Sequence, residues 1–240
     1  MSQSFEFKQF SVKHDKCAMR VNTDGCLLGA IAHPIEASES NDPVKILDIG
    51  TGSGVIALQL AQRYTEAHVD GIEIHGPSAF QAQANFKDSP FSNRMVCFHE
   101  GIQEFDINQQ YDMIVSNPPY FDKGPTKVHP GIAAARHALT LDFTTLIEKS
   151  FELMKDHGAL WCILPQDRLS TFMEEAYEHG LYLREIINIR PKATKDVNRV
   201  IVGLTKTDGP TERRELILYT ADADYTAEAR ALFAPFYITL

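Results

Sequence analysis

The sequence predicts an α/β fold in which helices cover both faces of a seven-stranded, mostly parallel sheet. From Val44 onward, short apolar runs alternate with helical patterns, which is typical of such a sheet. Only residues 191–198 join the last two expected strands, and because this connection is too short for a helix, we expect the last strand to be antiparallel. Four of the earlier runs end at a glycine or a polar residue, which favours a ligand site at their carboxyl ends.

Smaller elements flank the sheet. Residues 5–12 alternate loosely between apolar and polar side chains, as in a small edge hairpin. Thr23 and Asp24 then cap a short helix that ends at Ala32. The expected strands are 44–49, 67–73, 94–99, 111–116, 158–164, 182–190 and 199–205, and the expected helices between them are 55–63, 77–87, 143–155 and 169–179. An extended segment at 215–220 and a helix at 227–233 follow.

Composition argues against several classes of protein. The net charge of −9 over 240 residues disfavours a protein that coats nucleic acid nonspecifically. The four cysteines form no C-x-x-C pair and the nine histidines no ligand grouping, so we expect no metal site and a reducing compartment, the cytoplasm. No secretory signal is visible at residues 1–6, and no apolar run approaches about 18 residues, so we expect no membrane contact.

Basic residues are nevertheless concentrated in parts of the chain. The segment 184–206 carries six basic residues against two acids, the first twenty residues carry four against two, and a third group follows residue 120. If the three stretches converge around the pocket, they form a basic rim that suits a nucleic acid backbone. Ordinary solvated surface charges are the alternative. The three stretches include Lys123, Lys127, Arg136, Lys192, Lys195 and Arg199.

A glycine-rich turn, Gly50-Thr51-Gly52-Ser53-Gly54, joins the first core strand to a helix. Such a turn lets a ligand approach the backbone and leaves amides free at the helix N-terminus. A dinucleotide-binding turn reads G-x-G-x-x-G, but Val55 stands where its third glycine would be. Asp48 would repel a pyrophosphate, whereas it suits a ligand that carries an amino group and no phosphate. S-adenosylmethionine is such a ligand.

Two further strand ends support this ligand. Glu73 ends the next strand, 23 residues after Gly50, and an acid near that separation can accept both hydroxyls of a ribose. The third strand exits into residues 100–104, where a fold of this kind meets the adenine ring.

The most informative motif is Asn117-Pro118-Pro119-Tyr120, directly behind the apolar run 111–116. The two prolines fix φ near −65° and stiffen the corner. The Asn117 side-chain oxygen and the Pro118 carbonyl can accept the two hydrogens of a planar –NH2 group while Tyr120 stacks on its ring. Both acceptors direct the nitrogen lone pair toward an electrophile, so the corner predicts alkylation of an amino or amide nitrogen. A proline-stiffened loop without function is the alternative.

The glycine turn, the acidic strand end and this corner resemble the class I S-adenosylmethionine-dependent methyltransferases that modify amino nitrogens. The segments 7–12, 17–30, 135–137 and 236–237 are similar to bacterial tRNA (adenine-N6) methyltransferases that act beside the anticodon of a valine tRNA. The resemblance implies a Rossmann-like fold, S-adenosylmethionine as cofactor, no metal, tRNA as partner and no obligate protein partner. It also implies one domain, 1–240, in which 1–43 covers the cofactor pocket, 44–206 is the catalytic core and 207–240 is an appendage.

Carried onto this sequence, the resemblance assigns roles to individual residues. Asn117 and Pro118 would hold the adenine N6 amino group, and Tyr120 with Phe121 would stack on the flipped base. Lys123, Arg136, Lys192, Lys195 and Arg199 would contact RNA. The cofactor would lie against Asp48, Gly50, Thr51, Gly52, Gly54, Glu73, Ile74, Gly101, Ile102 and Asn117, with Thr23 and Asp24 closing the pocket. Relatives tend to carry an Asp where Gly101 stands, so Glu100 or a backbone group would have to contact the cofactor adenine instead.

Other functions stay open from the sequence. A protein-glutamine N5-methyltransferase uses the same tetrapeptide but usually carries an N-terminal helical domain, and an rRNA guanine-N2 methyltransferase tends to have Phe at the position of Tyr120. A DNA methyltransferase usually has a separate target-recognition domain. A nicotinamide oxidoreductase is disfavoured by Val55, and a cofactor-binding protein without catalysis is disfavoured by Asn117.

Overall fold

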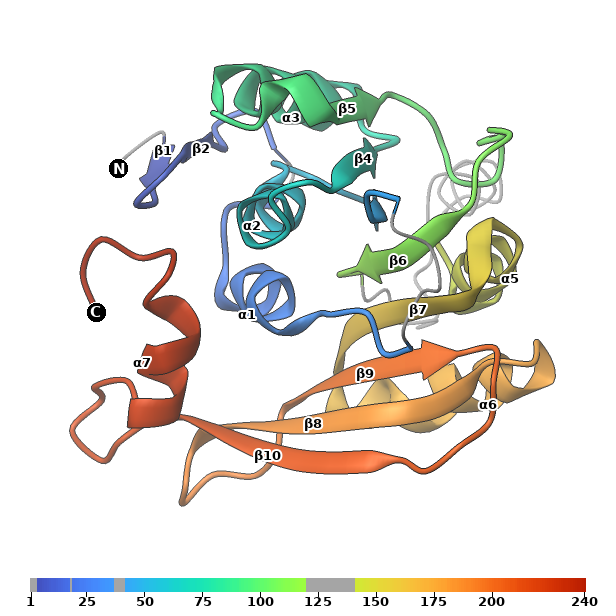
Figure 1. Cartoon of the computed structure of the whole chain (residues 1–240). Helices are drawn as coiled ribbons and strands as arrows, with labels where there is room; N and C mark the ends of the chain where they lie inside the picture. The colour runs from blue at the N-terminus through green and yellow to red at the C-terminus, as the bar shows by residue number, and fades with distance from the viewer. Residues whose placement is uncertain (1–3, 18, 37–41, 120–140) are drawn as a thin grey trace, which may run out of the picture.

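The computed structural model describes residues 4–17, 19–36, 42–119 and 141–240 (Figure 1). Its main sheet has the strand order β10-β8-β9-β7-β6-β3-β4-β5. All neighbours from β7 to β5 are parallel, whereas β9 is antiparallel to both β7 and β8, as the short connection 191–198 requires. The strands are β3 (Lys45–Ile49), β4 (His68–Ile72), β5 (Met95–Phe98), β6 (Tyr111–Ser116), β7 (Met154–Pro165), β8 (Tyr182–Lys192) and β9 (Arg199–Thr205).

The count of seven strands was too low by one. An eighth strand, β10 (Glu212–Tyr219), pairs in parallel with β8 at the edge of the sheet. Only its second half was expected to be extended, because residues 212–215 are all charged and exposed and show no alternation. Charged side chains are common on edge strands, where they hinder pairing with a further chain.

Helices pack against both faces of the sheet, as expected (Figure 1). Successive residues of a strand point to opposite faces, so Ile46 and Met113 belong to one core while Leu47 and Ile114 belong to the other. The first core also contains residues of α1 (Thr23–Ile31), α2 (Val55–Arg63), α3 (Gly76–Asp88) and α7 (Ala227–Phe233). The second contains residues of α5 (Phe143–Leu153) and α6 (Leu169–Glu178). Short 3-10 turns lie at Ser92–Arg94 and Gln166–Arg168.

Both ends of the described chain lie together (Figure 1). The hairpin of β1 (Ser4–Glu6) and β2 (Ser11–Lys13) packs beside the residues that follow α7. Phe7 forms a β-bridge with Tyr237, and the Lys8 backbone amide donates to the Phe236 carbonyl at 2.7 Å. The hairpin is therefore tied to the C-terminal segment.

One edge of the sheet collects the segments of interest. Strands β3 to β7 run in one direction, so their carboxyl ends share this edge. Because β9 is antiparallel to β7 and β8, its first residue, Arg199, pairs with Pro165 at the same edge, and β8 also ends there at Lys192. Among the described residues, no helix has both the length and the apolar character needed to cross a membrane.

Candidate active site

The glycine turn is built on left-handed backbone. Gly50, Gly52 and Gly54 have φ values of 71°, 57° and 84°, a region in which side chains other than glycine are strained. The amides of Gly50 and Thr51 both donate to the Ile72 carbonyl at 2.9 Å, which fastens the turn to the end of β4. Gly54 then immediately precedes α2. The sequence pattern therefore forms a tight turn whose backbone is held between two strands and a helix.

Asp48 lies beneath this turn. Its Oδ2 accepts from Thr51 Oγ1 at 2.6 Å and from the Ala57 amide at 3.3 Å, whereas its Oδ1 has no partner among the described residues. Burial raises the pKa of the Asp48 carboxyl to about 7, although both hydrogen bonds oppose the rise. Asp48 is not among the residues that line the adjacent cavity. Its two hydrogen bonds instead join the glycine turn to the first turn of α2.

Glu73 closes the turn from the other side. Its Oε2 accepts from the Gly52 amide at 2.9 Å and its Oε1 from the His75 amide at 2.8 Å. The carboxylate thus orients the middle of the glycine turn and the approach to α3. Each oxygen retains a lone pair for a further donor.

A cavity of about 270 Å³ lies over the turn at the carboxyl edge. Asn117 and Pro119, at the end of β6, contribute to its wall, and Ser116 Oγ fixes that end by donating to the Ile49 carbonyl at 2.9 Å. Of the expected cofactor residues, those that line the cavity are Gly50, Thr51, Gly52, Glu73, Ile74, Gly101, Ile102 and Asn117. Asp48, Gly54 and Thr23 do not line it, and neither does Pro118.

Sequence reasoning missed several lining residues. Arg20, Asn22 and Gly25 come from the entrance to α1, and Asn22 caps that helix by accepting from the Gly25 amide at 2.9 Å. The expectation that Thr23 and Asp24 cap α1 is therefore wrong, although an Asn directly before a helix is a recognisable capping signal. Gln103 also lines the cavity; the sequence marked its segment, 100–104, as the place of the adenine ring but did not single out this side chain. Tyr120, Phe121, Lys123, Lys127 and Arg136 lie outside the described residues.

Three basic residues expected to contact RNA lie at the carboxyl edge or in the loop after β8. Arg199 Nε forms an ion pair with Asp24 Oδ2 at 2.8 Å, so it joins the start of β9 to the first turn of α1. Lys192 Nζ donates to the Ala221 carbonyl at 2.9 Å, and Lys195 is exposed in the loop that follows β8. Arg199 thus has a structural contact beside the cavity.

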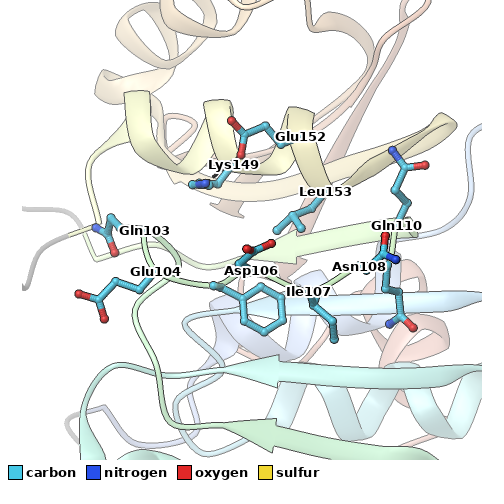
Figure 2. Close-up of a pocket in the computed structure, with 11 residues that line it drawn as sticks. Gln103, Glu104, Asp106, Ile107, Asn108, Gln110, Lys149, Glu152 and Leu153 are labelled. Carbon is cyan, nitrogen blue, oxygen red and sulfur yellow. Dashed lines mark hydrogen bonds and ion pairs between the residues drawn. The ribbon is translucent and has the colours of Figure 1, made fainter.

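A second and larger depression, of about 630 Å³, lies between the segment 103–110 and α5 (Figure 2). Its α5 wall carries Lys149 and Glu152, which form an ion pair at 2.8 Å. It contains neither the glycine turn nor Glu73 nor Asn117, and of the described residues only Gln103 lines both hollows. Size therefore does not identify the functional site. The smaller cavity is the candidate because the chemically specialised residues meet there.

Known proteins are similar to this chain in architecture and in sequence. The family described as methyltransferase small domain matches residues 34–179. Similar structures include a predicted O-methyltransferase from Agrobacterium tumefaciens, with a TM-score of 0.67 at 19% identity, covering 89% of this chain and 96% of that one. That likeness supports the class I methyltransferase fold.

Relatives with higher identity narrow the family. A Pedobacter heparinus protein named tRNA1(Val) (adenine(37)-N6)-methyltransferase is 37% identical over 99% of each chain. A Flavobacterium psychrophilum protein of the same name is 37% identical over 98% of this chain and 100% of its own. The chain therefore belongs to the methyltransferase small domain family and, within it, to the group of proteins named tRNA1(Val) (adenine(37)-N6)-methyltransferase.

Proposed function

We propose that this protein transfers a methyl group from S-adenosylmethionine to the N6 amino group of an adenosine in tRNA. The names of its relatives point to adenosine 37 of tRNA1(Val). The observation that carries the proposal is that the Asn117 corner and the Gly50 turn line one cavity. The residue that would accept the amino group and the turn that would bind the methyl donor therefore lie at the same cavity. Because tRNA is the substrate, we place the enzyme in the cytoplasm.

The residues of the cavity fit the cofactor. A Cβ atom added at Gly50 would have no neighbour within 4 Å, and one at Gly52 would meet only the Gly50 carbonyl at 3.9 Å. This open backbone can receive the methionine part of the cofactor, while Glu73 accepts the ribose hydroxyls and Ile74 and Ile102 contact the adenine. When bound, S-adenosylmethionine supplies an electrophilic methyl group. Asp48 acts indirectly in this proposal, by holding the shape of the turn.

The chain itself orients the nucleophile. The Asn117 side-chain oxygen and the Pro118 carbonyl accept the two N6 hydrogens, and this favours the pyramidal nitrogen that develops during attack. Tyr120 stacks on the adenine of the substrate. No strong general base is required, because orientation and preorganised acceptors supply most of the acceleration.

An anticodon loop suits this site. The target base must leave its stack to reach the cavity, which is least costly in a single-stranded loop. The chain as a whole is acidic, with a net charge of −9, so local basic residues have to attract the RNA backbone. Among the described residues, Lys192 and Lys195 remain candidates for this contact. Lys123 and Arg136, which lie outside the described residues, are further candidates. The glutamine and guanine methyltransferase alternatives are not favoured by the names of the relatives.

The Asn117→Ala variant tests the proposal. We expect it to lose nearly all methyl transfer to a tRNA1(Val) transcript while S-adenosylhomocysteine binding, measured by calorimetry, changes little. Asn108→Ala is a matched control, because Asn108 is exposed in the other depression. Nucleoside analysis of the wild-type product should give N6-methyladenosine. Wild-type turnover by Asn117→Ala, or a different methylated nucleoside, would contradict the proposal.

A further inference from the structure

We propose that Gln103 recognises the amino edge of the cofactor adenine, at a point of the cavity wall where Gly101 has no side chain of its own. The inference rests on the proposed function, since it assumes that the cavity binds S-adenosylmethionine. Gly101 lines the cavity beside Ile74 and Ile102 but has no side chain to offer. The structure assigns the polar contact with the adenine to Gln103, two positions further along the chain.

The placement of the Gln103 carboxamide is the main observation. A Cβ atom added at Gly101 would lie 3.0 Å from Gln103 Oε1 and 3.2 Å from Ile74 Cδ1. The amide of Gln103 therefore already occupies the space into which a side chain at position 101 would project. Ile74 borders the same space, so a planar ring lying against this isoleucine would have the amide within reach of its edge.

The backbone holds Gln103 in this place. The amides of Glu104 and Phe105 both donate to the Gly101 carbonyl at 3.1 Å, so the chain turns back on itself between residues 101 and 105. Phe105 is buried in the second core and anchors the turn. Figure 2 shows Gln103 at one end of the larger depression, away from Gln110 at the other end. These contacts hold the turn, and Gln103, which is exposed, lies at the boundary between the two hollows.

The chemistry of a carboxamide fits adenine. It has one acceptor oxygen and one donor nitrogen side by side, which match the 6-amino group and a neighbouring ring nitrogen of adenine. Glu100 also lines the cavity, and its carboxylate can accept from the 6-amino group, but only the carboxamide of Gln103 can also donate to the ring nitrogen. We therefore assign the adenine contact to Gln103 and make Glu100 the competing candidate.

The test compares two ligands on matched variants. The ligands are S-adenosylhomocysteine and its analogue in which hydrogen replaces the adenine 6-amino group, and the readout is the Kd of each by calorimetry. Gln103→Leu removes donor and acceptor at nearly constant volume. We expect it to weaken S-adenosylhomocysteine by about tenfold, which corresponds to about 1.4 kcal/mol, and to change the analogue much less. The preference for the amino group should then nearly disappear.

Two controls make the result decisive. Gln110→Leu has the same change at the far end of the depression, and we expect it to leave both Kd values unchanged. If Gln103→Leu keeps the wild-type preference, or weakens both ligands equally, the assignment is overturned. A preference lost in Glu100→Gln but kept in Gln103→Leu would transfer the role to Glu100. If the wild type binds neither ligand, the proposed function itself fails.

Discussion

At the scale of single residues, Gly50 and Gly54 share a left-handed backbone but have different surroundings. A Cβ atom at Gly54 would lie 2.5 Å from Cε1 of the buried Phe86, whereas one at Gly50 would project into open space. We expect Gly54→Ala to lower the free energy of unfolding by about 2–5 kcal/mol, from backbone strain and overpacking. Gly50→Ala should cost only the strain, about 1–2 kcal/mol.

The same two variants distinguish a loss of stability from a loss of cofactor binding. Because the added methyl group at position 50 stands where the cofactor would approach, we expect Gly50→Ala to weaken S-adenosylhomocysteine binding strongly in a protein that remains folded. Urea unfolding and calorimetric titration of both variants check this. Wild-type affinity in Gly50→Ala would show that the turn does not receive the cofactor.

Asp48 predicts a pH dependence of stability. Its pKa is about 7 in the folded chain and near 4 when unfolded, so between these values the folded state binds the extra proton. The contribution of Asp48 to stability is therefore greatest below about pH 4 and falls as the pH rises toward 7. Relative to Asp48→Asn, the wild type should lose about 2–3 kcal/mol of unfolding free energy between pH 5 and pH 8. Urea unfolding at both pH values measures this, and equal pH dependence in the two proteins would refute it.

At the scale of elements, the ion pair between Arg199 and Asp24 joins α1 to β9 beside the cavity. Both side chains are about one-quarter to one-third exposed, so the pair is worth at most about 1 kcal/mol. We expect Arg199→Ala to raise the Kd of S-adenosylhomocysteine about two- to fivefold, since α1 carries Asn22 and Gly25 into the cavity wall. Arg190→Ala is the control, because Arg190 pairs with Glu215 on β10.

A double-variant cycle shows whether the pair is responsible. Asp24→Ala alone should weaken the cofactor analogue as much as Arg199→Ala, and the combined variant should be no weaker than either. Additive effects would mean that the two residues act separately.

The elements themselves were largely predictable from local pattern. Buried strands such as Ile46–Ile49 are continuously apolar apart from Asp48, and the glycine turn marks its own position in the chain. Strand β10 was only half predicted because its charged first half is defined by pairing with β8. Contacts between distant residues were beyond any local pattern. Arg199 and Asp24, for example, are 175 residues apart. For Gln103, the sequence placed the segment 100–104 at the adenine ring, but it did not predict the turn at Gly101 that brings this side chain to the cavity.

At the scale of the whole molecule, we propose that residues 1–240 form one folding unit. The N-terminal hairpin meets the segment after α7 through the bridge between Phe7 and Tyr237, and α1 packs in the same core as α7. In this arrangement the C-terminal appendage supports the N-terminal extension, and the extension in turn contributes α1 to the cavity.

The distribution of charge predicts how RNA binding responds to salt. With a net charge of −9, the body of the protein repels RNA, so attraction has to come from local cations at the carboxyl edge. Lys192 is the last residue of β8 there and Lys195 lies in the loop after it, whereas Arg199 is already paired with Asp24. We therefore expect Lys192→Ala/Lys195→Ala to weaken tRNA binding and to reduce the slope of log K against log salt by about 1.4 to 1.8, from two lost phosphate contacts.

A charge-matched variant separates this effect from the change in net charge. Lys87 lies in the last turn of α3, and Arg213 lies at the beginning of β10, whose amino end is at the opposite edge of the sheet. We expect Lys87→Ala/Arg213→Ala to leave the slope nearly unchanged, because neither residue follows the carboxyl end of a strand. Filter binding of a tRNA1(Val) transcript over a range of salt concentrations gives both slopes. If the two double variants lose the same slope, only total charge matters, and the loop after β8 is not on the path of the RNA.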